Sequence, residues 1–252
     1  MLTEERHDRI RALLASKGRV LATELAEEFG VSEDTARRDL RELARLGDCR
    51  RVYGGALLPA PDYGTIQQRE TTLSETKTAL AGRVANLIET GQTLFIDAGS
   101  TNLAIARALP QTLAMTVVTN APDVANALSE HPNCKVILLG GLFNPAKGAC
   151  LGGQTVREAQ RIYADVFVLG TCGVDSQIGV TALDAEEAEL KRCFIEQSGR
   201  LIVPATADKI GTVAPFKLAS TSEIDVLVVE ARLDPALVAQ FEASGVRVDA
   251  LV

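Results

Sequence analysis

The feature that most constrains the fold is a series of seven short apolar segments between residues 93 and 249. Helical patterns lie between most of these segments. Short apolar runs that alternate with helices indicate a mainly parallel β-sheet covered by helices on both faces. The predicted strands are Thr93–Ile96, Met115–Thr119, Lys135–Leu139, Val166–Leu169, Arg200–Val203, Val226–Val229 and Val246–Asp249.

The first sixty residues have a different pattern, with three helical segments followed by a candidate hairpin. Apolar residues at helical spacing predict a first helix near the N-terminus, a second over about 22–29 and a third that Ser32 caps. The small Ala26 and Gly30 suit the close crossing and the turn of a helix-turn-helix. Residues 49–57 predict a β-hairpin, the wing of a winged helix-turn-helix.

The third predicted helix has a polar, basic face opposite its apolar stripe. Six arginines fall between residues 37 and 51, although residues 1–58 are neutral as a whole and the rest of the chain carries the net charge of −7. A basic helix face of this kind predicts contacts with base edges and phosphates in a DNA major groove. The alternative is a three-helix packing or dimerisation module with a basic surface. The predicted DNA-binding residues are Ser32, Asp34, Thr35, Arg37, Arg38, Arg41, Arg50 and Arg51.

Small and polar residues follow the predicted strands, where the carboxyl ends of parallel strands form ligand sites. Gly99 and Ser100 lead from a strand into a helix, so backbone N–H groups there would face an anion. Glu187 and Lys191 are spaced i, i+4 and would form either a surface ion pair or part of a cleft. The predicted effector-binding residues are Asp97, Gly99, Ser100, Thr101, Asn102, Asn120, Gly140, Gly141, Asp175, Glu187, Lys191 and Lys209.

Two of these predictions have equally good structural alternatives. Asn120 could cap the helix that follows it, and Gly140-Gly141 could form a tight turn. Five scattered cysteines without a Cys-x-x-Cys pair, and two histidines, predict neither a disulfide framework nor a metal site nor a catalytic triad. No cofactor motif, secretory signal or membrane-spanning run occurs, so we expect a cytoplasmic protein without cofactor or membrane partner.

The run Val31–Leu40, continuing to Arg51–Ala56, resembles the DNA-binding signature of the DeoR family of bacterial transcription regulators. The remainder resembles the DeoR-type sensor domain, which is related in fold to ribose-5-phosphate isomerase and glucosamine-6-phosphate deaminase. The resemblance implies an α/β protein with a winged helix-turn-helix at 1–58, a linker at 59–73, and a Rossmann-like sensing and oligomerisation domain at 74–252.

The resemblance also implies a function. The chain would repress a carbohydrate or polyol catabolic operon as a homo-oligomer, either dimer or tetramer, and a phosphorylated sugar would release it from double-stranded operator DNA. Gly99–Asn102 would receive the phosphate, and Gly173–Asp175, the Glu187/Lys191 helix and Lys209 would complete the pocket. The alternative is a sugar-phosphate isomerase or deaminase that uses Glu187 or Asp175 as its base.

Overall fold

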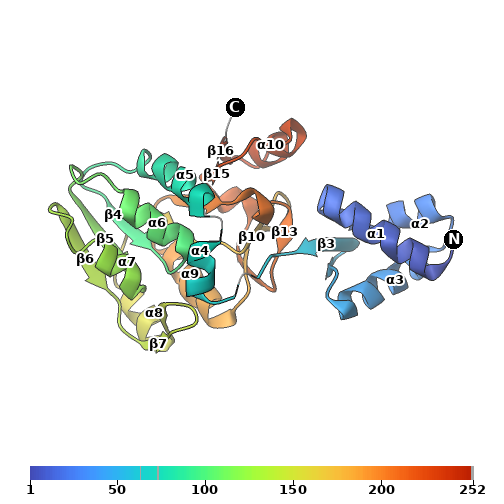
Figure 1. The fold of residues 1–252 in the computed structure, drawn as a ribbon, viewed down its shortest axis with the longest axis horizontal. Coiled ribbons are helices and arrows are strands. Elements are labelled where there is room, and N and C mark those ends of the chain that lie inside the picture. Colours follow the sequence, from blue (N-terminus) through green and yellow to red (C-terminus); the bar gives the residue numbers. More distant parts are fainter. Residues whose placement is uncertain (63, 73, 251–252) are drawn as a thin grey trace.

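The described chain contains two separate hydrophobic cores. The structure is a computed structural model that describes residues 1–62, 64–72 and 74–250. Figure 1 shows the helices α1 to α3 at one end of the long axis and the large sheet at the other. Residues 63 and 73 of the predicted linker and residues 251–252 of the predicted sensing domain lie outside the described residues.

The smaller core belongs to the N-terminal part, which forms the expected winged helix-turn-helix. Leu14, Leu25, Leu40 and Leu43 are almost completely buried there. Ser32 caps α3, because its side chain accepts a hydrogen bond from the Thr35 N–H at 3.2 Å. The elements are α1 (Thr3–Lys17), β1 (Arg19–Leu21), α2 (Ala22–Phe29), α3 (Glu33–Leu46), β2 (Arg50–Val52) and β3 (Gly55–Pro59). Strand β1, which pairs with β3, is the one of these elements that the sequence did not predict.

The larger part is a seven-stranded parallel sheet, which confirms the predicted α/β fold. All seven predicted strands form, with end positions that differ by at most two residues. In spatial order they are β16 (Arg247–Asp249), β15 (Val226–Val229), β12 (Leu201–Ala205), β9 (Val166–Val168), β4 (Thr93–Ile96), β5 (Met115–Thr119) and β6 (Cys134–Leu138).

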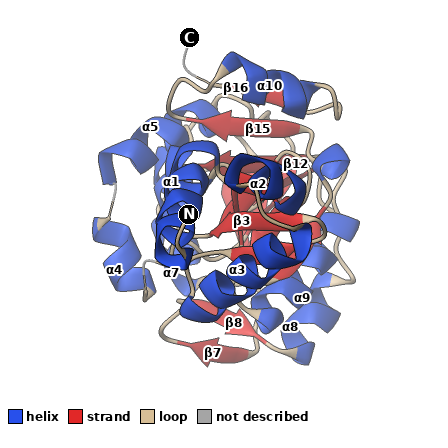
Figure 2. Cartoon of the chain, turned by 90° about the vertical axis from the view of Figure 1, so that its right-hand side faces the viewer, coloured by secondary structure: helices blue, strands red, loops and turns tan. Residues whose placement is uncertain are grey.

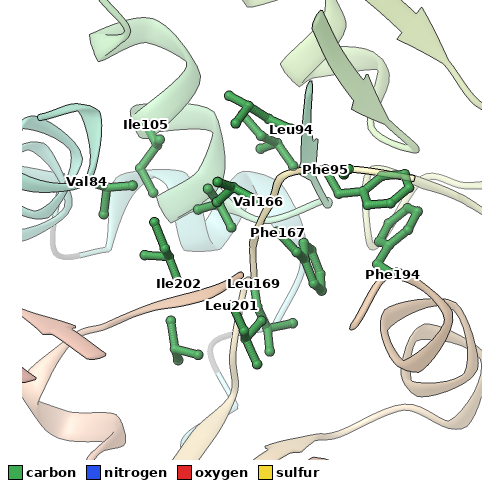
Figure 3. Close-up of a cluster of buried hydrophobic side chains, with 14 of the residues drawn as sticks. Val84, Leu94, Phe95, Ile105, Val166, Phe167, Leu169, Phe194, Leu201 and Ile202 are labelled. Carbon is green, nitrogen blue, oxygen red and sulfur yellow. The ribbon is translucent and has the colours of Figure 1, made fainter. Parts of the chain in front are cut away.

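Helices cover both faces of this sheet, as expected for a parallel sheet. Helices α4, α5 and α7 lie on one side and α8 and α9 on the other (Figure 2). Phe194 of α9 stacks on Phe95 at a centroid distance of 4.3 Å and meets the edge of Phe167 at 5.2 Å (Figure 3). The helices are α4 (Ile66–Thr71), α5 (Ser74–Ala85), α6 (Ser100–Ala108), α7 (Pro122–Ala127), α8 (Gly153–Ala159), α9 (Ala185–Glu196) and α10 (Pro235–Glu242). Among the described residues, no helix is long and apolar enough to cross a membrane.

Short strands outside the main sheet were not predicted, because most of them contain glycine or a polar residue and so show no continuous apolar run. They are the hairpin β7 (Leu142–Asn144) and β8 (Ala149–Leu151), the antiparallel group β10 (Gly173–Asp175), β11 (Gly179–Ala182) and β14 (Phe216–Ala219), and β13 (Thr212–Val213). Two 3-10 turns, η1 (Ala207–Lys209) and η2 (Thr221–Glu223), also form.

The two parts meet through a strand pair. Strand β3 leaves the helix-turn-helix and pairs in parallel with β13, with Leu58 opposite Thr212 and Pro59 opposite Val213. The segment 59–73, predicted as a linker, therefore begins inside β3, and it also contains the helix α4.

Candidate functional site

A cavity opens where the neighbouring strands β4, β9 and β12 end, at the carboxyl edge of the sheet. The loops that follow these three strands supply most of its wall, as the parallel topology predicts. Helices α4, α5 and α9 complete it. The residues around the cavity are Arg69, Lys77, Ala98, Gly99, Ser100, Thr101, Asn102, Gly170, Thr171, Cys172, Glu187, Lys191, Thr206 and Lys209. Eight of the predicted effector-binding residues thus lie in or beside this cavity when Asp97, which pairs with Lys191, is included.

The N-terminus of α6 points its first backbone N–H groups at the cavity. Ser100 and Thr101 begin the helix, and N–H groups in a first turn have no acceptor within the helix. Asn102 anchors this turn, because its amide donates to the Asp97 carboxylate at 2.8 Å and to the Val168 carbonyl at 3.1 Å. The arrangement suits an anion, since the helix dipole and the free N–H groups both favour negative charge.

A buried ion pair forms the floor of the cavity. Lys191 Nζ lies 2.8 Å from Asp97 Oδ2, and the two side chains are only 7% and 2% exposed. Lys191 also donates to the Gly170 carbonyl, and the Gly170 N–H donates to Asp97 Oδ1 at 2.7 Å. The alternative of a surface pair between Glu187 and Lys191 is therefore wrong, because Lys191 is buried and its carboxylate partner is Asp97.

The charge of Lys191 persists despite its burial. Burial by itself lowers the pKa of this ammonium, but the carboxylates of Asp97 and Glu187 outweigh that effect and raise the pKa above its usual value. Glu187 lies at the start of α9 and lines the cavity beside the lysine. Lys191 therefore stays charged in the floor of the cavity, where Asp97 pairs with it.

Two basic residues of the cavity, Arg69 of α4 and Lys77 of α5, were not predicted from the sequence. Lys77 donates to the backbone carbonyls of Arg69 and Thr72 and so ties the two helices together. Burial, with repulsion from Lys209, lowers the pKa of Lys77 to about 8. The sequence does carry a signal for Lys77, because it falls in the apolar stripe that continues through Leu80 and Val84.

The loop after β12 contributes Thr206 and Lys209. Lys209 Nζ donates to the Thr171 carbonyl at 2.9 Å, and burial lowers its pKa. Thr206 is 1% exposed, and its hydroxyl oxygen has no hydrogen-bond partner among the described residues. Arg69 Nε and Asn102 Oδ1 are likewise buried without a partner in the described chain. Since buried polar groups are normally paired, these three atoms favour a polar ligand in the cavity.

Four predicted effector residues do not line this cavity: Asn120, Gly140, Gly141 and Asp175. Asn120 braces two loops, because its amide accepts from the Ala98 N–H at 3.3 Å and donates to the Cys150 carbonyl at 3.0 Å. It does not cap α7, whose N-cap residue is Ala121. Its side chain shapes the loop beneath the cavity without facing the cavity itself.

Gly140 and Gly141 lie at the bend between β6 and β7. A Cβ atom on Gly141 would lie 2.1 Å from the Thr155 hydroxyl oxygen, so only glycine fits there. The Gly140 N–H donates to the Glu158 carboxylate at 3.0 Å. Asp175 closes the turn between β10 and β11, since its carboxylate accepts two backbone N–H bonds of 2.9 Å.

The polar face of α3 is exposed, as the sequence predicts. Arg37, Arg38 and Arg41 pair within the helix with Glu33 and Asp34, and all these side chains are largely exposed. Exposed pairs of this kind contribute little to stability. They can therefore exchange for phosphate contacts at small cost. The exposed Arg50 and Arg51 of β2 extend the same basic surface into the wing, and Ser32 and Thr35 lie at the start of the helix.

The orientation of α3 is fixed by a buried ion pair that the sequence did not reveal. Asp39 points inward from α3 and accepts two hydrogen bonds from the Arg6 guanidinium, at 2.7 and 3.0 Å. Both residues are buried. The fork geometry locks α3 against α1, which holds the basic face outward.

Two family models match different parts of the chain. Residues 6–61 match the family model described as "DeoR-like helix-turn-helix domain", and residues 72–231 match "DeoR C terminal sensor domain". A "Glycerol-3-phosphate regulon repressor" of Escherichia coli (strain K12) is 35% identical over 232 residues, which are 92% of each chain. The "HTH-type transcriptional regulator GlpR" of Haloferax volcanii is 33% identical over 251 residues, 98% of each chain.

Among solved structures, ribose 5 phosphate isomerase A from Neisseria gonorrhoeae is similar to 56% of this chain and 56% of its own, at 16% identity and a TM-score of 0.42. The two family models together cover most of the chain, and the relatives match it nearly from end to end. The chain belongs to the DeoR family of transcriptional regulators.

Proposed function

We propose that this protein is a transcription repressor that a phosphorylated sugar or polyol releases from operator DNA. The observation that carries the proposal is the cationic cavity at the carboxyl ends of β4, β9 and β12. Its walls and floor bring together four basic side chains, Arg69, Lys77, Lys191 and Lys209, while Glu187 is its acidic wall residue.

The phosphate would lie at the N-terminus of α6. There the N–H groups of the first turn and the hydroxyls of Ser100 and Thr101 offer donors to its oxygens. The basic side chains neutralise a dianion in a site shielded from water, where charge-assisted hydrogen bonds are strong. Asp97 repels the phosphate less than a free carboxylate would, because Lys191 pairs with it and Asn102 and Gly170 donate hydrogen bonds to it.

The sugar or polyol part would contact the opposite wall. Thr206 presents its unpaired hydroxyl there, and Glu187 offers a carboxylate that can accept hydrogen bonds from ligand hydroxyls. The relatives whose names refer to the glycerol-3-phosphate regulon support a small polyol phosphate as the effector. The same relatives are named as regulators, which supports regulation over the isomerase or deaminase alternative.

The DNA-binding half of the proposal rests on α3. With Asp39 holding the helix in place, Arg37, Arg38 and Arg41 can reach base edges and phosphates while Arg50 and Arg51 follow the backbone. A helix-turn-helix of this type reads two half-sites through a two-fold axis, so we propose a homo-oligomer, either dimer or tetramer.

A thermal-shift screen against phosphorylated and unphosphorylated sugars and polyols tests the effector proposal. A ligand at a hundred times its Kd adds about 2.7 kcal/mol of stability, or a rise in Tm of about 5–10 °C for a chain of this size. Arg69→Met should abolish that rise, whereas Arg107→Met on the exposed side of α6 should preserve it. An equal shift by the unphosphorylated compound, or a full shift in Arg69→Met, would contradict a phosphate site here.

A further inference from the structure

We propose that the strand pair β3–β13 transmits occupancy of the cavity to the DNA-binding part of the same chain. The proposal rests on the proposed function, because it takes the cavity as the effector site. Figure 1 shows β3 extending from the N-terminal helices to lie beside β13. Three features of the structure connect the cavity with this strand pair.

The first feature is the loop after β12, which leads from the cavity directly into β13. Thr206 and Lys209 line the cavity, and only Ile210 and Gly211 separate Lys209 from the first residue of β13, Thr212. The Thr212 hydroxyl donates back to the Lys209 carbonyl at 2.9 Å. A ligand that shifts the backbone of Lys209 therefore also moves the start of β13, through covalent bonds and one hydrogen bond.

The second feature is strand β10, which follows the loop after β9 and packs against β13. Cys172 lines the cavity, and the next residue, Gly173, packs against Thr212 so closely that a Cβ atom would lie 2.6 Å from the Thr212 carbonyl oxygen. The Gly211 N–H donates to the Val174 carbonyl at 2.7 Å. Both ligand-facing loops thus lead directly to β13, one through covalent continuity and the other through the packing of β10.

The third feature is the attachment of β13 to the helix-turn-helix. The Ala60 N–H donates to the Val213 carbonyl at 2.8 Å, and the Leu58 N–H donates to the Gly18 carbonyl at 2.8 Å. Gly18 ends α1 in a left-handed conformation (φ 70°), and a Cβ atom there would lie 3.0 Å from the Gly211 carbonyl oxygen.

Strand β3 also pairs with β2, where Ala56 lies opposite Arg51 of the wing. It therefore joins the sensing part to a strand that carries two of the proposed DNA contacts. Because β13 is only two residues long, few hydrogen bonds hold this junction. We expect effector binding to shift the junction between two arrangements that place the wing differently against DNA. Such a shift requires that the effector bind one arrangement more tightly than the other.

Hydrogen exchange of the full chain, followed by mass spectrometry, tests the connection without any ligand. Lys209→Ala removes the bond to Thr171, and we expect the Leu58 and Ala60 amides to exchange about tenfold faster. The matched control, Lys217→Ala, changes an exposed lysine of β14 and should leave them unchanged. Exchange in β15 reports whether each variant is folded. Unchanged exchange in residues 57–60 while residues 206–211 exchange faster would overturn the proposal.

A second arm adds glycerol 3-phosphate to the wild-type chain and to Gly173→Ala, in which the new Cβ atom pushes the β9 loop away from Thr212. We expect the compound to protect residues 98–103 in both proteins but to alter exchange in residues 55–60 only in the wild type. An equal change in Gly173→Ala would overturn the route through β13. If glycerol 3-phosphate does not protect residues 98–103 in the wild type, this result would count against glycerol 3-phosphate as the effector. The Lys209→Ala experiment would then still test the connection between the cavity and the DNA-binding part.

Discussion

Replacing Lys191 by methionine tests the buried floor of the cavity. The substitution keeps most of the apolar stem and removes the ammonium that lies 2.8 Å from Asp97 Oδ2. Asp97 would retain its hydrogen bonds from the Gly170 N–H and the Asn102 amide, but one carboxylate oxygen would be left buried without a cation. The substitution therefore isolates the contribution of one charge in a site that excludes water.

The expected loss of stability follows from that unpaired charge. Removing one partner of a buried ion pair costs about 3–5 kcal/mol, and the two remaining hydrogen bonds place Lys191→Met near the lower end. The double variant Asp97→Asn/Lys191→Met removes both charges of the pair and should be more stable than Lys191→Met by about 1–3 kcal/mol. Single substitution of Lys191 is thus a poor test of effector binding, since it perturbs the fold as well.

The loss should also depend on pH. Burial raises the pKa of the Asp97 carboxyl and the Lys191 ammonium opposes that effect, so removing the ammonium raises this pKa further. An acid with a raised pKa in the folded state binds more protons there than in the unfolded chain, so the free energy of unfolding falls as pH rises through that pKa. The free energy of unfolding of Lys191→Met should accordingly lie closer to that of the wild type at pH 5 than at pH 8.

Urea unfolding of wild type, Lys191→Met, Asp97→Asn and the double variant at pH 5 and pH 8 measures these differences. The wild type shows how much the free energy of unfolding changes with pH for reasons other than the substitution. An exposed ion pair typically contributes less than about 1 kcal/mol to stability. If Lys191→Met lowers the free energy of unfolding by less than this at pH 8, the buried ion pair is refuted. A cost that does not change with pH would refute the role assigned to the Asp97 charge.

Three further predictions concern binding and assembly. Arg37→Ala and Arg38→Ala should each weaken operator binding without lowering Tm, because both side chains are exposed on α3. If the arginine contacts a base, its loss should reduce discrimination between operator sequences by about 1–3 kcal/mol. If it contacts a phosphate, its loss should make operator affinity depend less steeply on salt concentration. Unchanged operator affinity in both variants would remove the role of α3. Effector affinity measured by calorimetry should fall as pH rises from 7 to 9, because Lys77, with a pKa of about 8, loses its charge in this range. In Lys77→Met, effector affinity should change less with pH. Sedimentation of the full chain at micromolar concentration should show a dimer or tetramer, and a monomer would contradict the proposed two-fold reading of DNA.

The main sheet and the helix-turn-helix were predictable because both leave periodic signals in the sequence. Buried parallel strands are apolar throughout, as in Val226–Val229, and α3 has an apolar stripe opposite a basic face. The strands outside the main sheet were not predictable for the opposite reason. Strand β13 has two residues, and its partner β3 lies about 150 positions earlier in the sequence. No local sequence pattern therefore predicts the pairing.

The candidate site was only partly predictable. The rule that ligands bind at strand ends located Gly99–Asn102 and Lys209, and the family resemblance added Lys191. The same rule also selected Asn120 and Asp175, whose polar groups serve neighbouring backbone. Strand-end position does not reveal where a side chain points. Arg69 was missed because it comes from a helix inside the segment predicted as a linker, and only the tertiary fold brings that helix to the sheet.

The most direct test of the proposed function is release of the full chain from DNA by a phosphorylated effector. The assay follows the fluorescence anisotropy of a labelled duplex, selected from a random pool by the protein itself, while glycerol 3-phosphate, other polyol and sugar phosphates, or their unphosphorylated parents are added. We expect at least one phosphorylated compound to release the duplex, its parent to have no effect, and Arg69→Met to bind the duplex normally yet resist release. Release by the unphosphorylated parent alone, or the same release curve for wild type and Arg69→Met, would contradict the proposed phosphate-sensing cavity.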